Sequence, residues 1–301
     1  VLINNIDELK KIIEEIRIKG LVSIDTETNS LNLEQANLVG ISLSFNEDKG
    51  FYIPINHKDI ESGKRLKDQL EEKKVLEQIR LICSDSSILK IGQNLKYDIR
   101  LLKKYNITFN SIDDTMLLSY ALDNGLTRHG MDDLSYRHLN HETIKYKDLV
   151  GTGKKQISFD YVSIDLATKY AAEDALITLK LYNVLKPRLI KEKSSYIYEK
   201  IDKPLIDVLS LMEERGIKVD SKYLQKLSKE FLNESNKIEK LIFKITGKEF
   251  NIGSPKQLGE ILFLEMKIKG GKKTKTGTYS TDSGILEDLS SQGHEIAKLV
   301  L

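Results

Sequence analysis

The sequence predicts an α/β first part followed by a mainly α-helical second part. Apolar residues alternate as they do in strands over 21–27, 38–45 and 50–55, and a short apolar strand is expected at 88–92. Apolar residues at helical spacing separate and follow these strands. Beyond residue 194 the segments read as helices and one polar loop. This change of pattern predicts two domains, 1–193 and 194–301.

The helices are expected where apolar residues recur every three or four positions. In the first part they cover 5–19, 69–84, 94–106, 113–123, 131–139 and 162–189. Asn94 is the expected N-cap of the third of these helices, and Pro187 the expected end of the last. In the second part helices are expected at 194–216, 221–247 (N-capped by Ser221) and 254–266, followed by a basic Gly/Thr-rich loop at 270–281.

Composition narrows the class of protein. The chain has 301 residues, 40% hydrophobic and 31% charged, which is typical of a globular rather than a disordered protein. Its apolar runs are shorter than the roughly 18 residues of a membrane span. The single cysteine, Cys83, excludes an internal disulfide and a multi-cysteine metal site. These features favour a reduced, cytoplasmic protein without a membrane segment.

Two carboxylates, Asp25 and Glu27, stand at i and i+2 in the strand that contains IDTET. Residues two apart on a strand project from one face, so both carboxylates are expected to point the same way. After the apolar run LVSI such a pair is costly to bury unless a cation neutralises it. The alternative is a solvated strand end, because DxE pairs are common.

Two further carboxylates lie on predicted helices. Asp98 follows Asn94 by one turn in GQNLKYD, and Tyr170 and Asp174 form an i, i+4 pair in YAAED. Read singly, Asp98 is an ordinary surface residue and Asp174 an exposed residue beside a core tyrosine. Read together, four carboxylates from a strand and two helices are what a pair of divalent ions needs, since Mg²⁺ and Mn²⁺ take oxygen ligands.

Three segments together resemble a known family. IDTETNSL (24–31), GQNLKYD (92–98) and YAAED (170–174) are similar to the three motifs of the DEDD exonucleases, and the tyrosine four residues before the last aspartate marks the DEDDy branch. Their order and the segments TRHGMDDL (127–134) and GKKQISF (153–159) resemble the proofreading domain of bacterial DNA polymerase I, a family A polymerase.

The resemblance continues into the second part. Residues 202–220, 250–263 and 272–281 are similar to the opening of the polymerase domain, up into its thumb. It implies a ribonuclease H-like mixed sheet flanked by helices, followed by a helical thumb segment. Because the chain begins with Val1 and ends at Leu301, we expect a fragment that stops before the palm and fingers and lacks the polymerase active site.

The family also implies roles for individual residues. Asp25, Glu27 and Asp174 would bind one metal ion, and Asp25 and Asp98 a second, with Asp98 acting through water. The ions would be Mg²⁺ or Mn²⁺, with Zn²⁺ a further candidate for one site. Tyr170 would position the attacking water. The expected substrate contacts are Thr28, Leu31, Asn94 and Arg128, and the expected contacts of the thumb loop with duplex phosphates are Lys272, Lys273 and Lys275. A turn or core role for Leu31, and a solvated linker in place of a DNA-binding loop, remain alternatives.

The predicted activity is removal of frayed or mismatched 3′-terminal nucleotides from DNA by two-metal-ion hydrolysis. Single-stranded DNA would enter the exonuclease site and duplex DNA would meet the thumb, in a monomer. One alternative is a DEDDy ribonuclease of the ribonuclease D type. The other is a non-catalytic DNA-binding fragment.

Overall fold

The computed structural model describes residues 1–126, 128–274 and 277–301 of the chain. The described residues form two compact units, Val1–Gly216 and Ile217–Leu301. The first unit contains a sheet covered by helices, and the second is helical, so the predicted fold class is confirmed. The functional division expected at 193/194 stays a prediction.

The first unit is built on one mixed sheet with the strand order β3-β2-β1-β4-β5. Its strands are β1 (Leu21–Thr28), β2 (Leu38–Asn46), β3 (Lys49–Pro54), β4 (Leu89–Gly92) and β5 (Ile112–Asp114). Strands β1, β2 and β3 pair antiparallel, whereas β4 runs parallel to both β1 and β5. Strand β1 is therefore central, with hydrogen-bonded neighbours on both sides. The first four strands confirm the sequence predictions, while β5 lies where part of a helix was expected.

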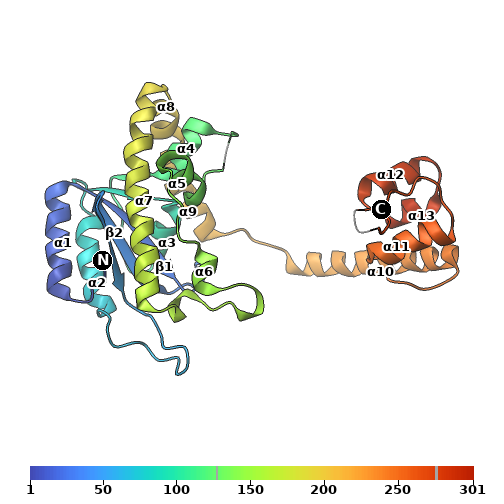
Figure 1. Cartoon of the computed structure of the whole chain (residues 1–301), viewed down its shortest axis with the longest axis horizontal. Coiled ribbons are helices and arrows are strands. Elements are labelled where there is room, and N and C mark those ends of the chain that lie inside the picture. Colours follow the sequence, from blue (N-terminus) through green and yellow to red (C-terminus); the bar gives the residue numbers. More distant parts are fainter. Residues whose placement is uncertain (127, 275–276) are drawn as a thin grey trace. The chain divides into compact units, whose positions relative to one another are not determined.

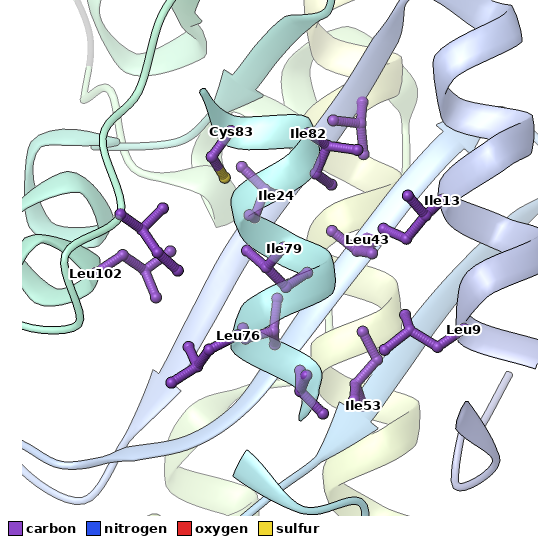
Figure 2. Close-up of a cluster of buried hydrophobic side chains, with 14 of the residues drawn as sticks. Leu9, Ile13, Ile24, Leu43, Ile53, Leu76, Ile79, Ile82, Cys83 and Leu102 are labelled. Atoms are coloured by element: carbon purple, nitrogen blue, oxygen red, sulfur yellow. The ribbon is translucent and has the colours of Figure 1, made fainter. Parts of the chain in front are cut away.

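Helices cover both faces of this sheet (Figure 1). Those of the first unit are α1 (Ile6–Lys19), α2 (Glu72–Cys83), α3 (Lys96–Lys103), α4 (Thr115–Asp123), α5 (Met131–Leu139), α6 (Tyr146–Val150), α7 (Ile164–Lys191), α8 (Ser195–Ile197) and α9 (Lys203–Arg215). Figure 2 shows side chains of α1 and α2, such as Leu9 and Ile79, packed on the sheet around Ile24 and Leu43. No helix among the described residues is long and apolar enough to cross a bilayer.

Helix α7 lies against the opposite face of the sheet at close range. Its small residues Ala167, Ala171 and Ala172 pack with Tyr52 of β3 in a second buried cluster. A Cβ atom on Gly50, at the start of β3, would lie only 1.8 Å from the carbonyl oxygen of Ala172. The missing side chain of Gly50 and the small alanine side chains at this crossing let the helix approach the sheet, and so bring residues of α7 near β1.

Two helix-end predictions are wrong. Asn94 is not an N-cap: it has φ +60°, and its N–H and that of Leu95 donate to the Asp114 carboxylate (3.3 and 2.8 Å), so α3 begins at Lys96. Helix α7 also continues past Pro187 to Lys191. Buried Leu185 and Leu189 hold this last turn in the core, which offsets the hydrogen bond that proline cannot make.

The segment after α7 also packs into the first unit. A π-helical turn, Tyr198–Asp202, precedes α9, whose second residue is Pro204. The Tyr198 side chain is fully buried, and its hydroxyl donates to Asp113 at 2.9 Å. Lys186 and Lys203 form salt bridges with the same carboxylate at 3.0 and 3.1 Å. The end of α7 and the start of α9 are therefore joined through one buried aspartate.

The second unit is a small helical body with its own core. Its helices are α10 (Ser221–Thr246), α11 (Pro255–Glu260), α12 (Ser283–Ser291) and α13 (Glu295–Val300). Helix α10 is N-capped by Asp220, which accepts from the Tyr223 N–H at 3.0 Å, rather than by Ser221. Helix α11 continues as a π-helical turn over Ile261–Glu265, so most of the helix expected at 254–266 is present. In the loop at 270–281, Lys273 and Tyr279 form an isolated antiparallel bridge.

Candidate active site

Three carboxylates meet between the central strand and α7. Asp25 and Glu27 lie opposite Ser42 and Gly40 of β2, and their i, i+2 spacing places them on one face of the sheet. Asp174 reaches them from α7. One oxygen of each of these carboxylates lies within 4.8 Å of one oxygen of each of the other two. The structure thus brings together two sequence motifs that lie almost 150 residues apart.

Burial and mutual repulsion make this cluster electrostatically unfavourable by itself. Burial raises the pKa of Asp25 to about 7. The pKa of Glu27 is raised well above its ordinary value by burial and then by the charges of Asp25, Asp174 and Asp98. Within the described part of the chain, the Oε1 atom of Glu27 is buried without a hydrogen-bond partner. A buried carboxylate oxygen without a donor is costly, and a cation would remove this cost.

Asp98 approaches the same strand from α3. Its Oδ1 atom accepts hydrogen bonds from the backbone N–H of Thr26 at 2.9 Å and from the Thr26 hydroxyl at 2.5 Å. Thr26 lies between Asp25 and Glu27, so the strand that carries the acidic pair also anchors the fourth carboxylate. Burial, and then the charge of Asp25, raise the pKa of Asp98.

Tyr170 lies one helical turn before Asp174 on α7. Burial, and then the charges of Asp174 and Glu27, raise the pKa of its phenol well above the ordinary value. The hydroxyl therefore stays protonated at neutral pH and can donate a hydrogen bond, but it cannot serve as a base.

The donor set fits divalent cations. The carboxylates of Asp25, Glu27 and Asp174 offer oxygen ligands, which hard cations prefer, and the Oε1 atom of Glu27 has no hydrogen-bond partner among the described residues. The buried cluster would lose much of its repulsion on binding such an ion. The acidic cluster is thus a candidate divalent-cation site.

A pocket of about 410 Å³ opens over the carboxylates. All four of them and Tyr170 line it, as do the predicted substrate residues Thr28, Leu31 and Asn94. Leu31 is 92% exposed, which excludes a core role for this leucine. The Thr28 hydroxyl is within hydrogen-bonding distance, 2.8 Å, of the hydroxyl of Tyr97 and also donates to the Ser30 carbonyl at 3.0 Å.

The other predicted contacts lie elsewhere. Arg128 is exposed and does not line this pocket, and its carbonyl accepts from Arg137 at 3.1 Å. Lys272 and Lys273 are exposed in the second unit, where the Lys273 ammonium lies 5.4 Å from the centre of the Tyr279 ring. Lys275 lies outside the described residues.

Several residues of the pocket had no role in the sequence predictions. They are Thr26, Ser30, Gln93, Tyr97, Met131 and Tyr146. Tyr97 could have been found, because it directly precedes Asp98 in a recognised motif. Tyr146 carries no such signal. It is the first residue of α6, and its position in the pocket depends on the loop that precedes this helix.

The α/β fold with its acidic cluster, followed by a helical unit, agrees with the two family models that match the chain. The family model described as 3′-5′ exonuclease matches residues 1–190, and the model described as DNA polymerase family A matches residues 221–301. The chain belongs to this 3′-5′ exonuclease family of family A DNA polymerases, and the resemblance drawn from the sequence motifs is confirmed.

Individual relatives agree with this assignment. The chain is 45% identical over its whole length to DNA polymerase I of Rhizobium leguminosarum, and 38% identical over 93% of its length to that of Pseudomonas aeruginosa; in each case it spans 31% of the relative. A solved structure, the POL domain of Pol1 from M. smegmatis in complex with DNA primer-template and dNTP, shares the fold with a TM-score of 0.67 at 23% identity, over 97% of this chain and 46% of that one. The chain thus spans about a third of the length of these curated relatives.

Proposed function

We propose that the chain is the proofreading part of a DNA polymerase I, a 3′→5′ exonuclease that removes mismatched or frayed 3′-terminal nucleotides from DNA. The observation that carries the proposal is the cluster of half-buried Asp25 with buried Glu27 and Asp174, in which the Glu27 Oε1 atom is unpaired among the described residues, at the base of a pocket. The names of the relatives supply the polymerase context.

Two divalent ions, Mg²⁺ or Mn²⁺ with Zn²⁺ as a candidate for one site, would share these carboxylates. Asp25, Glu27 and Asp174 would hold one ion, while Asp25 and Asp98 would hold the other. When bound, such a pair lowers the pKa of a water molecule and offsets the negative charge that develops on a phosphodiester during hydrolysis. Thr26 would keep the Asp98 carboxylate oriented toward the pocket through its two hydrogen bonds.

The remaining residues of the pocket would orient the substrate. The protonated hydroxyl of Tyr170 would hold the attacking water in line with the last phosphodiester, whose cleavage releases a nucleoside 5′-monophosphate. Aromatic side chains of the pocket offer faces on which a terminal base can stack. Leu31 projects into solvent at the rim, where it can wedge beside that base. Such a site grips a single-stranded end, and a mismatched end frays into single strand more readily.

Hydrolysis of a single-stranded oligonucleotide that carries a label near its 5′ end tests the proposal. The wild type should shorten the DNA one nucleotide at a time in Mg²⁺ or Mn²⁺, and Asp98→Ala should reduce the rate by orders of magnitude. A strong preference for RNA would favour the ribonuclease D alternative. Activity that is equal in the two proteins, or absent from both, would favour the non-catalytic DNA-binding alternative.

Other expectations stay predictions. They comprise contacts of Arg128 with substrate phosphate, contacts of Lys272, Lys273 and Lys275 with duplex DNA, the monomeric state and the cytoplasmic location. Because the chain spans only about a third of the length of these relatives, polymerase activity is likewise a proposal.

A further inference from the structure

Glu173, the neighbour of Asp174, binds a segment of chain rather than the cation site. Its Oε1 atom accepts a hydrogen bond from Nε2 of His141 at 2.8 Å, and its Oε2 atom accepts from the backbone N–H of Ile144 at 2.7 Å. The Glu173 side chain is only 17% exposed. Adjacent residues on a helix point in different directions, and Glu173 does not line the pocket over the carboxylates.

The segment that Glu173 holds is the connection 140–145 between α5 and α6. Asn140 ends α5 in the left-handed conformation, with φ +50°. Asp132 of α5 ties the segment from the other side, because it accepts from the Thr143 hydroxyl and forms a 2.8 Å salt bridge with Lys145. The connection is thus fixed between two helices although it has no helical or strand structure itself.

Tyr146 follows this segment directly and lines the pocket. Its ring stacks on buried Phe159, with centroids 6.1 Å apart and planes 8° from parallel, and meets the Tyr170 ring edge-on at 6.1 Å. The Tyr146 side chain is still 43% exposed. One face is therefore held by the protein core, while the remainder is open to a planar ligand.

We propose that Glu173 is a positioning residue: by holding segment 140–145 against α7, it fixes the Tyr146 ring beside the carboxylates and so sets how firmly the 3′-terminal base is held. The inference rests on the proposed exonuclease function. It assigns Glu173 and His141 to the grip on the base, and leaves cation binding to the four carboxylates.

The glutamine variant separates these roles with little change of shape. Both oxygens of Glu173 accept hydrogen bonds, whereas a glutamine side chain has one acceptor and one donor. In Glu173→Gln the amide oxygen can still accept from Ile144, but the amide nitrogen can bond to His141 only by donating to the other imidazole tautomer, so the variant removes the negative charge that strengthens both bonds. Exposed Asp165, in the first turn of the same helix, gives a matched control as Asp165→Asn, which also removes one negative charge from α7.

The first test is steady-state hydrolysis of single-stranded DNA by the full chain. In Glu173→Gln, KM should rise about five- to tenfold, the effect of roughly one hydrogen bond, with kcat within about twofold of wild type. The change should vanish on an oligonucleotide whose 3′-terminal nucleotide lacks its base. It should also add nothing to Tyr146→Ala in the double variant. A loss of kcat at unchanged KM, or additive effects, would overturn the proposal.

The second test does not need hydrolysis. Backbone hydrogen exchange within 140–146 should accelerate in Glu173→Gln and not in Asp165→Asn, while Mn²⁺ affinity measured by calorimetry stays at the wild-type value. Unchanged exchange in this segment refutes the positioning role even if the wild type proves inactive. Inactive wild type with accelerated exchange would instead defeat the exonuclease function while leaving the structural tie in place.

Discussion

The carboxylates around Asp25 make the stability of the metal-free protein depend on pH. With a folded-state pKa of about 7 against an ordinary 3.8, Asp25 holds more protons in the folded than in the unfolded state between these values. Such a group lowers the free energy of unfolding as the pH rises. Buried His57 acts oppositely: its pKa is lowered to about 4 by burial, so stability is lost as the pH falls from 6.5 toward 4. The two effects overlap in any single melting curve.

Asp174→Asn isolates the carboxylate effect, because His57 is the same in both proteins. In EDTA at pH 8 the variant should melt above the wild type, by roughly 2–4 °C for each kcal/mol of repulsion removed. At pH 5 the difference should shrink, since the wild-type carboxylates regain protons. With excess Mn²⁺ the order should reverse, because the wild type keeps all its ligands. Thermal unfolding followed by circular dichroism measures all three conditions, and a difference in EDTA that is independent of pH would contradict charge repulsion.

The Tyr170 hydroxyl gives a second prediction at the residue scale. Tyr170→Phe should lower kcat by about 10- to 100-fold, the value of a hydrogen bond of roughly 1.5–3 kcal/mol to a charged group. The pH at which the rate rises should not move, because the phenol of Tyr170 remains protonated throughout. A pH–rate profile of wild type and variant checks both points, and a shift of the profile would show that the phenol titrates.

At the scale of elements, the packing of α7 on β3 determines where Asp174 lies relative to Asp25 and Glu27. Gly50→Ala would place a methyl group 1.8 Å from the Ala172 carbonyl oxygen, so strand and helix must separate. We expect a loss of about 1–3 kcal/mol in the free energy of unfolding, typical of overpacking, and weaker Mn²⁺ binding because Asp174 moves with α7. Denaturant unfolding and calorimetry measure these effects. Gly130→Ala is the control, since a Cβ atom there meets nothing within 4 Å.

Elements also show what the sequence could predict. Strand and helix periodicity placed Asp25, Glu27, Tyr170 and Asp174 correctly because these patterns are local. The helix start at Asn94 was misjudged because asparagine favours both N-caps and the left-handed conformation, and the distant Asp114 carboxylate decides between them. Strand β5 was missed because three residues that pair only with β4 leave no periodic signal. The position of Tyr146 in the pocket depends on contacts of segment 140–145 with α5 and α7. No local sequence pattern predicts such contacts.

At the scale of the whole molecule, the division into two units predicts where a protease will cut. All residues from 211 to 220 are exposed, and the boundary between the units falls at Gly216/Ile217. Brief trypsin treatment should therefore cleave after Arg215 or Lys218 before it cleaves within α1, α2 or α7. Mass spectrometry of the first fragments identifies the cuts, and a variant with both Arg215→Gln and Lys218→Gln should be protected there. Early fragments that end near residue 193 would contradict this division.

Contacts of the buried Asp113 show that the first compact unit extends beyond residue 190, where the exonuclease family match ends. Tyr198 and Lys203, which bind this carboxylate together with Lys186, both lie beyond residue 190, where the exonuclease match ends. Helix α9 adds a further tie, since Glu213 pairs with Lys96 and Arg100 of the helix that carries Asp98. A proofreading module transplanted into another polymerase at residue 190 would thus keep Lys186 beside the buried Asp113 but lose Tyr198 and Lys203, and the helix that carries Asp98 would lose its ion pairs with Glu213. A graft that extends through Gly216 would carry both supports with it.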